Sequence, residues 1–177
     1  MRLALVLLLP AALAACAPAV HLRAVPRPAT SSVPASAPAV LTPADTVAIG
    51  ALLDGYHAAA SRADFDGYFG RMTEDAVFIG TDASERWTKA QFAAYVQPYF
   101  SRGRGWTYRP TVRRISLLPG YGAAFFDELL DSDAYGMCRG TGVVVRTDGG
   151  WKIAQYALTF PIPNDLAGEI TRRIRGQ

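Results

Sequence analysis

The charged side chains that could do chemistry in this chain lie on neighbouring stretches of predicted strand. Asp127 and Glu128 are adjacent, and Arg139 lies in the stretch Cys138 to Phe160. A buried carboxylate can serve as a general base. Since neighbouring strand residues point to opposite faces, Asp127 and Glu128 cannot form a catalytic pair, and the pattern leaves open which one is inside. We expect the buried one to pair with Arg139, because a buried charge needs a partner.

Other reactive groups are poorly placed for catalysis or metal binding. Of the two histidines, His21 lies in a proline-rich stretch and His57 on the first predicted helix. Cys138 has no histidine near it in sequence, so we interpret it as a buried structural cysteine. No cluster has the spacing of a metal site, and no glycine-rich loop has that of a phosphate site. We therefore expect no metal and no cofactor.

The N-terminal part resembles the export signal of bacterial lipoproteins. Residues 3–13 are apolar except for Pro10, and Leu13-Ala14-Ala15-Cys16 resembles a lipobox. This resemblance implies a signal peptide at 1–15, lipidation of Cys16, and attachment to the outer membrane facing the periplasm. An ordinary signal peptide is the alternative. Residues 16–41 are rich in proline and alanine and predict a disordered linker, which leaves 42–177 as one domain.

The periodicity of residues 42–177 predicts helices first and long strands afterwards. Helical spacing begins at Thr42 and at Asp64, and Thr88 starts a third helix with a capping box. Short strands are expected at 75–81 and 85–88, and long ones at 106–117, 122–130, 135–146 and 151–160. Short turns between the long strands indicate an antiparallel meander, with a short amphipathic helix after Asn164. The predicted class is α+β, with helices on one face of a strongly curved sheet.

The order and spacing of these motifs resemble the nuclear transport factor 2-like superfamily, and within it the SnoaL-like domains. The stretches that carry the resemblance are TEDAVFIGTD at 73–82, the helix from Thr88, FDELLD at 126–131, 138–160 and PIPND at 161–165. It implies a cone-shaped, mostly antiparallel sheet wrapped on N-terminal helices. This fold carries many unrelated activities, so it does not fix the function.

The resemblance also implies a pocket inside the cone. Residues expected to line it are Arg139, Gln155, Tyr156, Trp106, Trp87 and Thr141. Together they suit a mostly apolar site with a few polar contacts, although any single aromatic residue is more often core packing. The kinase association domains of this superfamily carry two histidines where this chain has Gln155 and Ala157. Their absence argues against an enzyme.

The sequence therefore predicts a lipid-anchored cell-envelope domain that binds a small, partly apolar molecule, with Arg139 holding an anion or the buried carboxylate. One alternative is an isomerase, dehydratase or cyclase that uses Asp127 or Glu128 as general base. Another is a non-catalytic dimerisation module. A homodimer through the exposed sheet is expected. The formal net charge of +3 comes from scattered residues, so no nucleic acid partner is expected.

Overall fold

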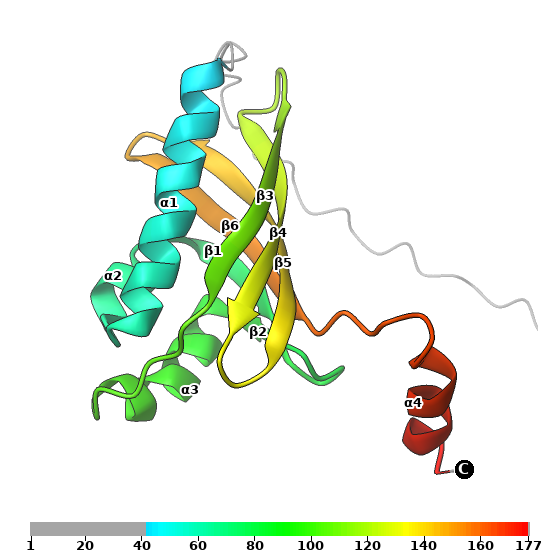
Figure 1. Cartoon of the computed structure of the whole chain (residues 1–177). Helices are drawn as coiled ribbons and strands as arrows, with labels where there is room; N and C mark the ends of the chain where they lie inside the picture. The colour runs from blue at the N-terminus through cyan, green and yellow to red at the C-terminus, as the bar shows by residue number, and fades with distance from the viewer. Residues whose placement is uncertain (1–41, 177) are drawn as a thin grey trace, which may run out of the picture. The chain divides into compact units, whose positions relative to one another are not determined.

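A computed structural model of the chain describes residues 42–176. The predicted signal peptide, Cys16 and the linker lie outside the described residues, so they stay predictions. Three helices precede most of the sheet: α1 (Pro43–Ser61), α2 (Phe65–Phe69) and α3 (Lys89–Phe100). The strands are β1 (Met72–Ile79), β2 (Arg86–Thr88), β3 (Arg109–Leu118), β4 (Ala123–Ser132), β5 (Gly136–Thr147) and β6 (Gly150–Thr159), and α4 (Ala167–Ile174) follows (Figure 1).

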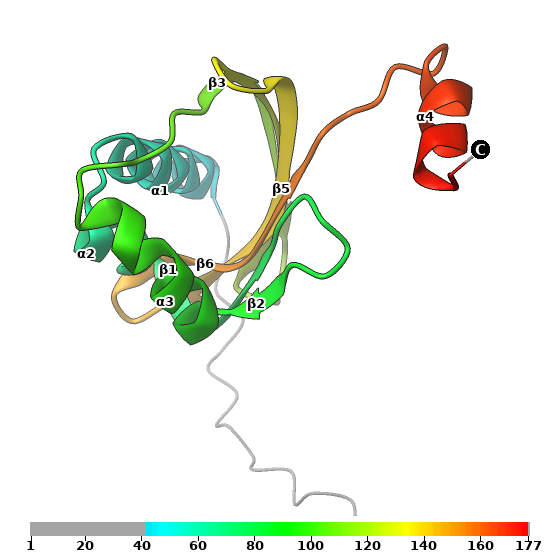
Figure 2. The same cartoon turned by 90° about the horizontal axis from the view of Figure 1, so that it is seen from below.

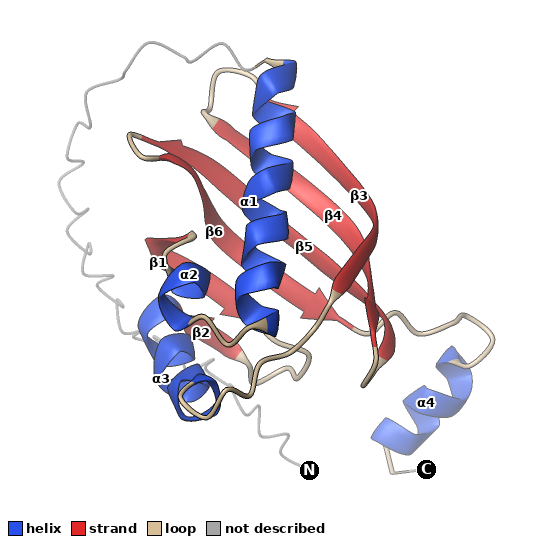
Figure 3. Cartoon of the chain, turned by 60° about the vertical axis from the view of Figure 1, so that its left-hand side comes forward, coloured by secondary structure: helices blue, strands red, loops and turns tan. Residues whose placement is uncertain are grey.

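The six strands form one sheet in the order β2-β1-β6-β5-β4-β3. Strands β3 to β6 are the predicted antiparallel meander, whereas β1 runs parallel to β6 and carries β2 on its outer edge. The helix α1 crosses one face of the sheet (Figure 3), and the strands curve around the side where α1, α2 and α3 lie (Figure 2). The predicted α+β class and mostly antiparallel curved sheet are confirmed.

Local signals in the sequence explain where the helices begin. Pro43 occupies the first turn of α1, and the Asp45 carboxylate accepts a hydrogen bond of 2.7 Å from the backbone N–H of Thr42. The same carboxylate accepts a hydrogen bond of 3.1 Å from Nε1 of Trp151 on β6. The Thr88 side chain caps α3 by accepting from Gln91 N. The bond between Trp151 and Asp45 connects the start of α1 to the sheet.

The core lies between the helices and the inner face of the sheet. It is rich in aromatic side chains and also includes aliphatic residues of α1 and of the meander, for example Ile49, Leu53, Leu130 and Ile153, each 0% exposed. Alternation along the strands assigns every second residue to this inner face. The opposite face of the sheet carries the other half of each strand. This division decides which of the predicted site residues can reach a pocket.

The predicted element bounds needed small corrections. The first strand begins at Met72, three residues before its predicted start, because Met72 is buried in the sheet and not on a helix face. The third strand begins at Arg109 rather than Trp106, whose ring packs among core aromatics. None of the α4 residues is buried. Within residues 42–176, no helix has both the length and the apolar character needed to cross a bilayer.

Candidate functional site: a buried histidine–glutamate pair beneath an aromatic cavity

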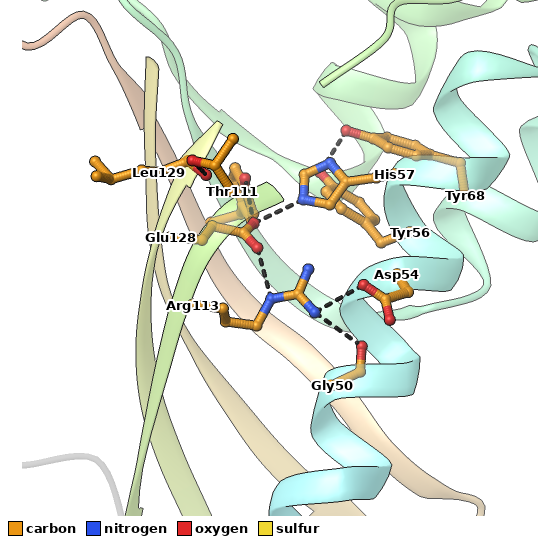
Figure 4. Close-up of polar contacts among 10 residues, drawn as sticks. Gly50, Asp54, Tyr56, His57, Tyr68, Thr111, Arg113, Glu128 and Leu129 are labelled. Atoms are coloured by element: carbon orange, nitrogen blue, oxygen red, sulfur yellow. Dashed lines mark hydrogen bonds and ion pairs between the residues drawn. The ribbon is translucent and has the colours of Figure 1, made fainter. Parts of the chain in front are cut away.

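A histidine and a glutamate meet between α1 and the sheet. His57 follows Leu53 by one helical turn, so it lies on the face of α1 that packs on the sheet, and it is 6% exposed. Glu128 on β4 is 0% exposed. His57 Nε2 lies 2.7 Å from Glu128 Oε1 (Figure 4). A buried acid in contact with an imidazole is the arrangement that orients a histidine for proton transfer.

Arg113 holds the second oxygen of the Glu128 carboxylate. Its Nε donates to Glu128 Oε2 at 2.8 Å, and its Nη1 donates to Asp54 Oδ1 at 2.8 Å and to the carbonyl of Gly50 at 3.2 Å (Figure 4). Arg113 and Glu128 are direct partners in the register of β3 and β4. The Nη2 atom of Arg113 is fully buried and has no hydrogen-bond partner within residues 42–176. Arg113 thus links the Glu128 carboxylate on the sheet to Asp54 and Gly50 on α1.

Glu128 accepts a further hydrogen bond from the floor of the site. The Tyr156 hydroxyl on β6 donates to Oε1 at 2.9 Å, the same oxygen that His57 contacts. Burial by itself raises the pKa of the Glu128 carboxyl. The hydrogen bonds and charges of His57 and Arg113 lower it by a larger amount, so that the pKa lies below its ordinary value. The carboxylate is therefore ionised at neutral pH. Because an ionised carboxylate only accepts hydrogen bonds, His57 Nε2 carries a proton.

This tautomer decides what the other ring nitrogen can do. In a neutral imidazole with the proton on Nε2, Nδ1 is the acceptor, and in the protonated ring it becomes a donor. His57 also lines a cavity, whereas Glu128 lies behind it. His57 can therefore act as a base or an acid toward a molecule in the cavity, while Glu128, which does not line the cavity, orients its ring.

The cavity above this pair has a volume of about 210 Å³ and a largely aromatic wall. Its lining comes from the helices, the sheet and the loops at the open ends of the strands. The residues are Tyr56, His57, Tyr68, Phe78, Gly80, Thr81, Glu85, Trp87, Phe92, Tyr95, Trp106, Tyr108, Tyr135, Tyr156, Leu158 and Phe160. An apolar wall with a few convergent polar groups is typical of small-molecule sites.

Two further tyrosines bring their hydroxyl groups together in this wall. The hydroxyls of Tyr56 on α1 and Tyr68 on α2 form a hydrogen bond, and their rings stack with centroids 4.2 Å apart. Burial raises the pKa of both hydroxyls well above the usual value, so both stay protonated at neutral pH. Burial also raises the pKa of Tyr108 to about 12. These hydroxyls are neutral donors and acceptors toward the cavity.

The structure decides which of the two adjacent carboxylates is inside. Glu128 faces the helices, while Asp127 lies on the opposite face of the sheet, partly exposed, with Oδ2 3.4 Å from Nη1 of Arg114. Neither carboxylate lines the cavity. Glu128 is the buried one of the two, and its cationic partner is an arginine.

The expected partner, Arg139, is wrong, and Arg113 takes this place. Arg139 is exposed and lies opposite Leu129 and Thr159, on the outer face of the sheet. Its neighbours Cys138 and Gly140 point inward, so strand alternation turns Arg139 outward. Arg113 lies on β3, on the other side of β4 from Arg139, and it reaches the carboxylate instead.

The six residues expected to line the pocket divide by the face they occupy. Trp87, Trp106 and Tyr156 do line the cavity. Thr141 and Gln155 do not line it, because each lies next along its strand to an inward-facing residue, Gly142 and Tyr156 respectively, and therefore faces outward. The register of β5 and β6 pairs Thr141 with Ala157 and Val143 with Gln155, all on the outer face. The predicted pocket is therefore present with half of its expected lining.

His57 and Arg113 were missed as site residues. The available signal for His57 was its position in the helical series Leu53, Tyr56, His57 and Ala60, which places a polar ring on the buried face of α1. Arg113 could have been found by counting the β3–β4 hairpin register from its turn. Cys138 is buried, and burial raises the pKa of its thiol, in agreement with a structural role. In the described part of the chain, no cluster of metal-ligating side chains is formed.

Comparison with known proteins shows the relationship of the chain. The family model described as a SnoaL-like domain matches residues 49–163. No protein of curated function matches the sequence.

Among solved structures, one similar chain is a proposed aromatic ring hydroxylase from Novosphingobium aromaticivorans, with 22% identity, a TM-score of 0.58, and coverage of 70% of this chain and 93% of that one. A domain of unknown function with a cystatin-like fold from Nostoc punctiforme has 20% identity, a TM-score of 0.60, and coverage of 77% and 95%. A proposed dehydratase of the NTF2-like family from Streptomyces avermitilis has 13% identity, a TM-score of 0.58, and coverage of 68% and 98%. At these identities the likeness shows the fold alone.

Proposed function

Because this chain belongs to the SnoaL-like domain family, whose fold commonly binds small molecules or acts as a dehydratase or isomerase, we propose that its cavity binds a small, partly apolar molecule and that His57 acts on it as a general acid–base group. The observation that carries this proposal is the contact between His57 Nε2 and Glu128 Oε1 at 2.7 Å beneath an aromatic cavity. It revises the alternative in which Asp127 or Glu128 itself is the base.

The chemistry follows from the tautomer of His57. Nδ1 takes a proton from a carbon next to a carbonyl group of the ligand, and the resulting imidazolium is stabilised by the Glu128 carboxylate. The proton then returns at another carbon, which is an isomerisation, or goes to a leaving hydroxyl group, which is a dehydration. Tyr156 and Arg113 keep the carboxylate ionised and fixed during the cycle. The name of the Streptomyces avermitilis structure is in keeping with the second outcome.

A proton-exchange experiment tests this proposal. We would incubate the full-length chain with 2-tetralone, a small aromatic ketone, in heavy water, and follow exchange of the protons next to the carbonyl by NMR. The expected result is exchange above the buffer rate, lowered roughly 10²- to 10⁴-fold in the variant His57→Gln. Asp127→Asn, which changes the neighbouring carboxylate on the outer face, is the matched control and should leave exchange unchanged. Binding of 2-tetralone is measured in parallel from shifts of the tryptophan signals.

Binding without turnover is the second candidate function. The cavity wall favours it, since most of its lining residues are aromatic or aliphatic and carry no reactive group. If 2-tetralone shifts the signals of Trp87 and Trp106 but exchanges no faster than in buffer, the domain is a binding protein. If 2-tetralone neither binds nor exchanges, the acid–base proposal loses its support.

We also propose that the mature chain is attached to a membrane through lipidated Cys16, in the outer membrane facing the periplasm. The lipobox-like sequence Leu13-Ala14-Ala15-Cys16 supports this proposal. Two or three acyl chains would hold the domain firmly, since each buried methylene contributes about 0.8 kcal/mol. Intact mass of the membrane-extracted protein should include the acyl chains, and Cys16→Ala should release the protein into the soluble fraction. A soluble wild-type protein without added mass would contradict it.

Homodimer formation through the outer sheet face is a further proposal, and it retains the assembly alternative. Phe125, Val112 and Met137 on this face are 48%, 38% and 51% exposed. Exposed apolar side chains on one sheet face are typical of association surfaces. Sedimentation should give twice the monomer mass for the wild type, and Phe125→Glu should shift it to the monomer. The same change at Tyr121, which is 83% exposed in the β3–β4 turn, is the control.

A further inference from the structure

The described residues that line the cavity include one carboxylate side chain, which is half-buried, and no lysine or arginine. This side chain is Glu85, on the connection between β1 and β2. The other acid of the site, Glu128, is already paired with Arg113 and is not a lining residue. Glu85 forms no ion pair within residues 42–176. Its negative charge is therefore available to a ligand.

The local backbone is shaped to hold the Glu85 carboxylate in this place. Gly80 N donates to the Glu85 carbonyl at 2.8 Å, and Asp82 N donates to Glu85 Oε2 at 3.2 Å. A Cβ atom added at Gly80 would lie 2.1 Å from the same oxygen. The Glu85 carboxylate thus occupies the space that the side chain of any residue other than glycine would need at position 80.

Four aromatic side chains line the same cavity as this carboxylate and are half-buried or exposed, which places them toward its mouth. The rings of Trp87 and Tyr95 meet almost at right angles, with centroids 4.4 Å apart and an interplanar angle of 80°. Tyr135 and Phe160 form a second pair, with centroids 5.0 Å apart. Burial raises the pKa of the Tyr95 hydroxyl, so this side chain stays neutral. All four rings line the same cavity as Glu85.

Such a combination recognises positive charge. The face of an aromatic ring carries negative potential and attracts a cation within about 6 Å of its centroid. A carboxylate beside the rings adds Coulombic attraction, while an anionic group would be repelled. Arg86, the nearest cationic residue in sequence, is the β2 partner of Ile79 and does not line the cavity. The mouth therefore has the charge opposite to that expected when Arg139 was placed in the pocket.

We infer that the ligand carries an amine or quaternary ammonium group, which the mouth of the cavity binds between Glu85 and the rings of Trp87, Tyr95, Tyr135 and Phe160. The apolar body of the same ligand fills the aromatic interior above His57. This inference rests on the proposed function only in requiring that the cavity binds a small molecule. It does not require that His57 acts chemically.

The test uses three small molecules that differ in charge and have nearly the same shape. Choline is the cation, 3,3-dimethylbutan-1-ol is its neutral counterpart, and 3,3-dimethylbutanoate is the anion. Each is titrated into the full-length chain, and binding is followed by the NMR signals of the tryptophan side chains. Choline should bind most tightly and the anion most weakly. Glu85→Gln should weaken choline by about threefold to tenfold and leave the neutral alcohol unchanged.

Two further variants make the result specific to this carboxylate. Glu169→Gln in α4 removes the same charge far from the lining and should leave choline binding unchanged. Gly80→Ala keeps the charge but displaces the carboxylate, and should weaken choline as Glu85→Gln does. Equal binding of choline and the neutral alcohol, or no effect of Glu85→Gln, would overturn the inference while cavity binding stands. If none of the three binds, the inference is overturned, and the 2-tetralone titration decides separately on cavity binding.

Discussion

His57 on α1 and Glu128 on β4 stand 71 positions apart in sequence, and their side chains meet at 2.7 Å between Nε2 and Oε1. Helix α1 approaches the sheet closely enough for this contact because the residues around His57 on the same helix face, among them Leu53 and Ala60, are apolar and buried. The contact is therefore positioned by the core. Changes to the core and changes to the site should have linked effects.

Removing the charge of Glu128 should strongly destabilise the domain. Glu128→Gln leaves the Arg113 guanidinium with only the exposed Asp54 carboxylate as a charged partner, so the free energy of unfolding should fall by about 3 kcal/mol. Asp127→Asn changes the next residue, whose ion pair with Arg114 is exposed, and should cost less than about 1 kcal/mol. Urea unfolding of the two variants measures both values. Similar losses for both would contradict the assignment of the two faces.

Stability should fall in acid because of the same residue. The pKa of Glu128 is lower in the folded state than in the unfolded chain, where glutamate titrates near pH 4.3, roughly its reference value. Its contribution is therefore present above about pH 4.3 and is lost as the pH falls toward the folded pKa, since the unfolded state binds the proton more readily. Unfolding curves between about pH 6 and pH 2 should show a smaller decrease for Glu128→Gln than for the wild type. Parallel curves would argue against an ionised buried carboxylate.

Stability should also fall in alkali because of the buried tyrosines. Burial raises the pKa of Tyr56, Tyr68 and Tyr156 well above the usual value, so the folded state keeps their protons when the unfolded chain would release them. Their contribution is complete below about pH 10 and is lost as the pH rises further. The part of the tyrosinate absorbance that Tyr56, Tyr68 and Tyr156 contribute should increase together with the loss of helical circular dichroism. Ionisation of these hydroxyls in a folded protein would contradict the prediction. Tyr56→Phe should reduce the alkaline sensitivity.

A methyl group at Gly140 should disturb the floor of the site. A Cβ atom there would lie 2.2 Å from the Tyr156 hydroxyl oxygen and 3.1 Å from Glu128 Cγ. We expect Gly140→Ala to lower the free energy of unfolding by about 1–3 kcal/mol, as overpacking does. Gly149→Ala, where the nearest atom is Thr147 Oγ1 at 3.9 Å, should be within about 0.5 kcal/mol of the wild type. Thermal unfolding compares them, and an unaffected Gly140→Ala would mean that the Tyr156 ring moves freely.

The fold was predictable from the sequence because its signals are local. The capping box at Thr88 and the apolar spacing after it correctly give α3, and the turns near Pro119 and Asp148 give the hairpins. The family resemblance to SnoaL-like domains is confirmed over residues 49–163. The parallel pairing of β1 with β6 was not predicted, because it depends on contacts between segments far apart in the sequence.

The site was predictable only in part because it depends on strand phase. A single shift in alternation moves a residue from the cavity to the opposite face, and Arg139 was placed on the wrong one. Gly140 and Gly142 leave room for the Tyr156 and Phe126 rings, a role that depends on the strand face they occupy. His57 was set aside because of its place on the first helix, and its partner Glu128 comes from a strand far along the chain. Such pairings require the register of the whole sheet.

Part of the cavity mouth lies outside the helices and strands, unlike the His57–Glu128 pair, and this has a consequence for how such a domain can change. Glu85 and Tyr135 lie in connections between strands, whereas His57 and Glu128 lie inside the packed elements. Connections tolerate substitution better than packed elements do. Glu85 and Tyr135 can therefore be exchanged while the His57–Glu128 contact keeps its geometry, so the rim of the cavity can diverge independently of its buried pair.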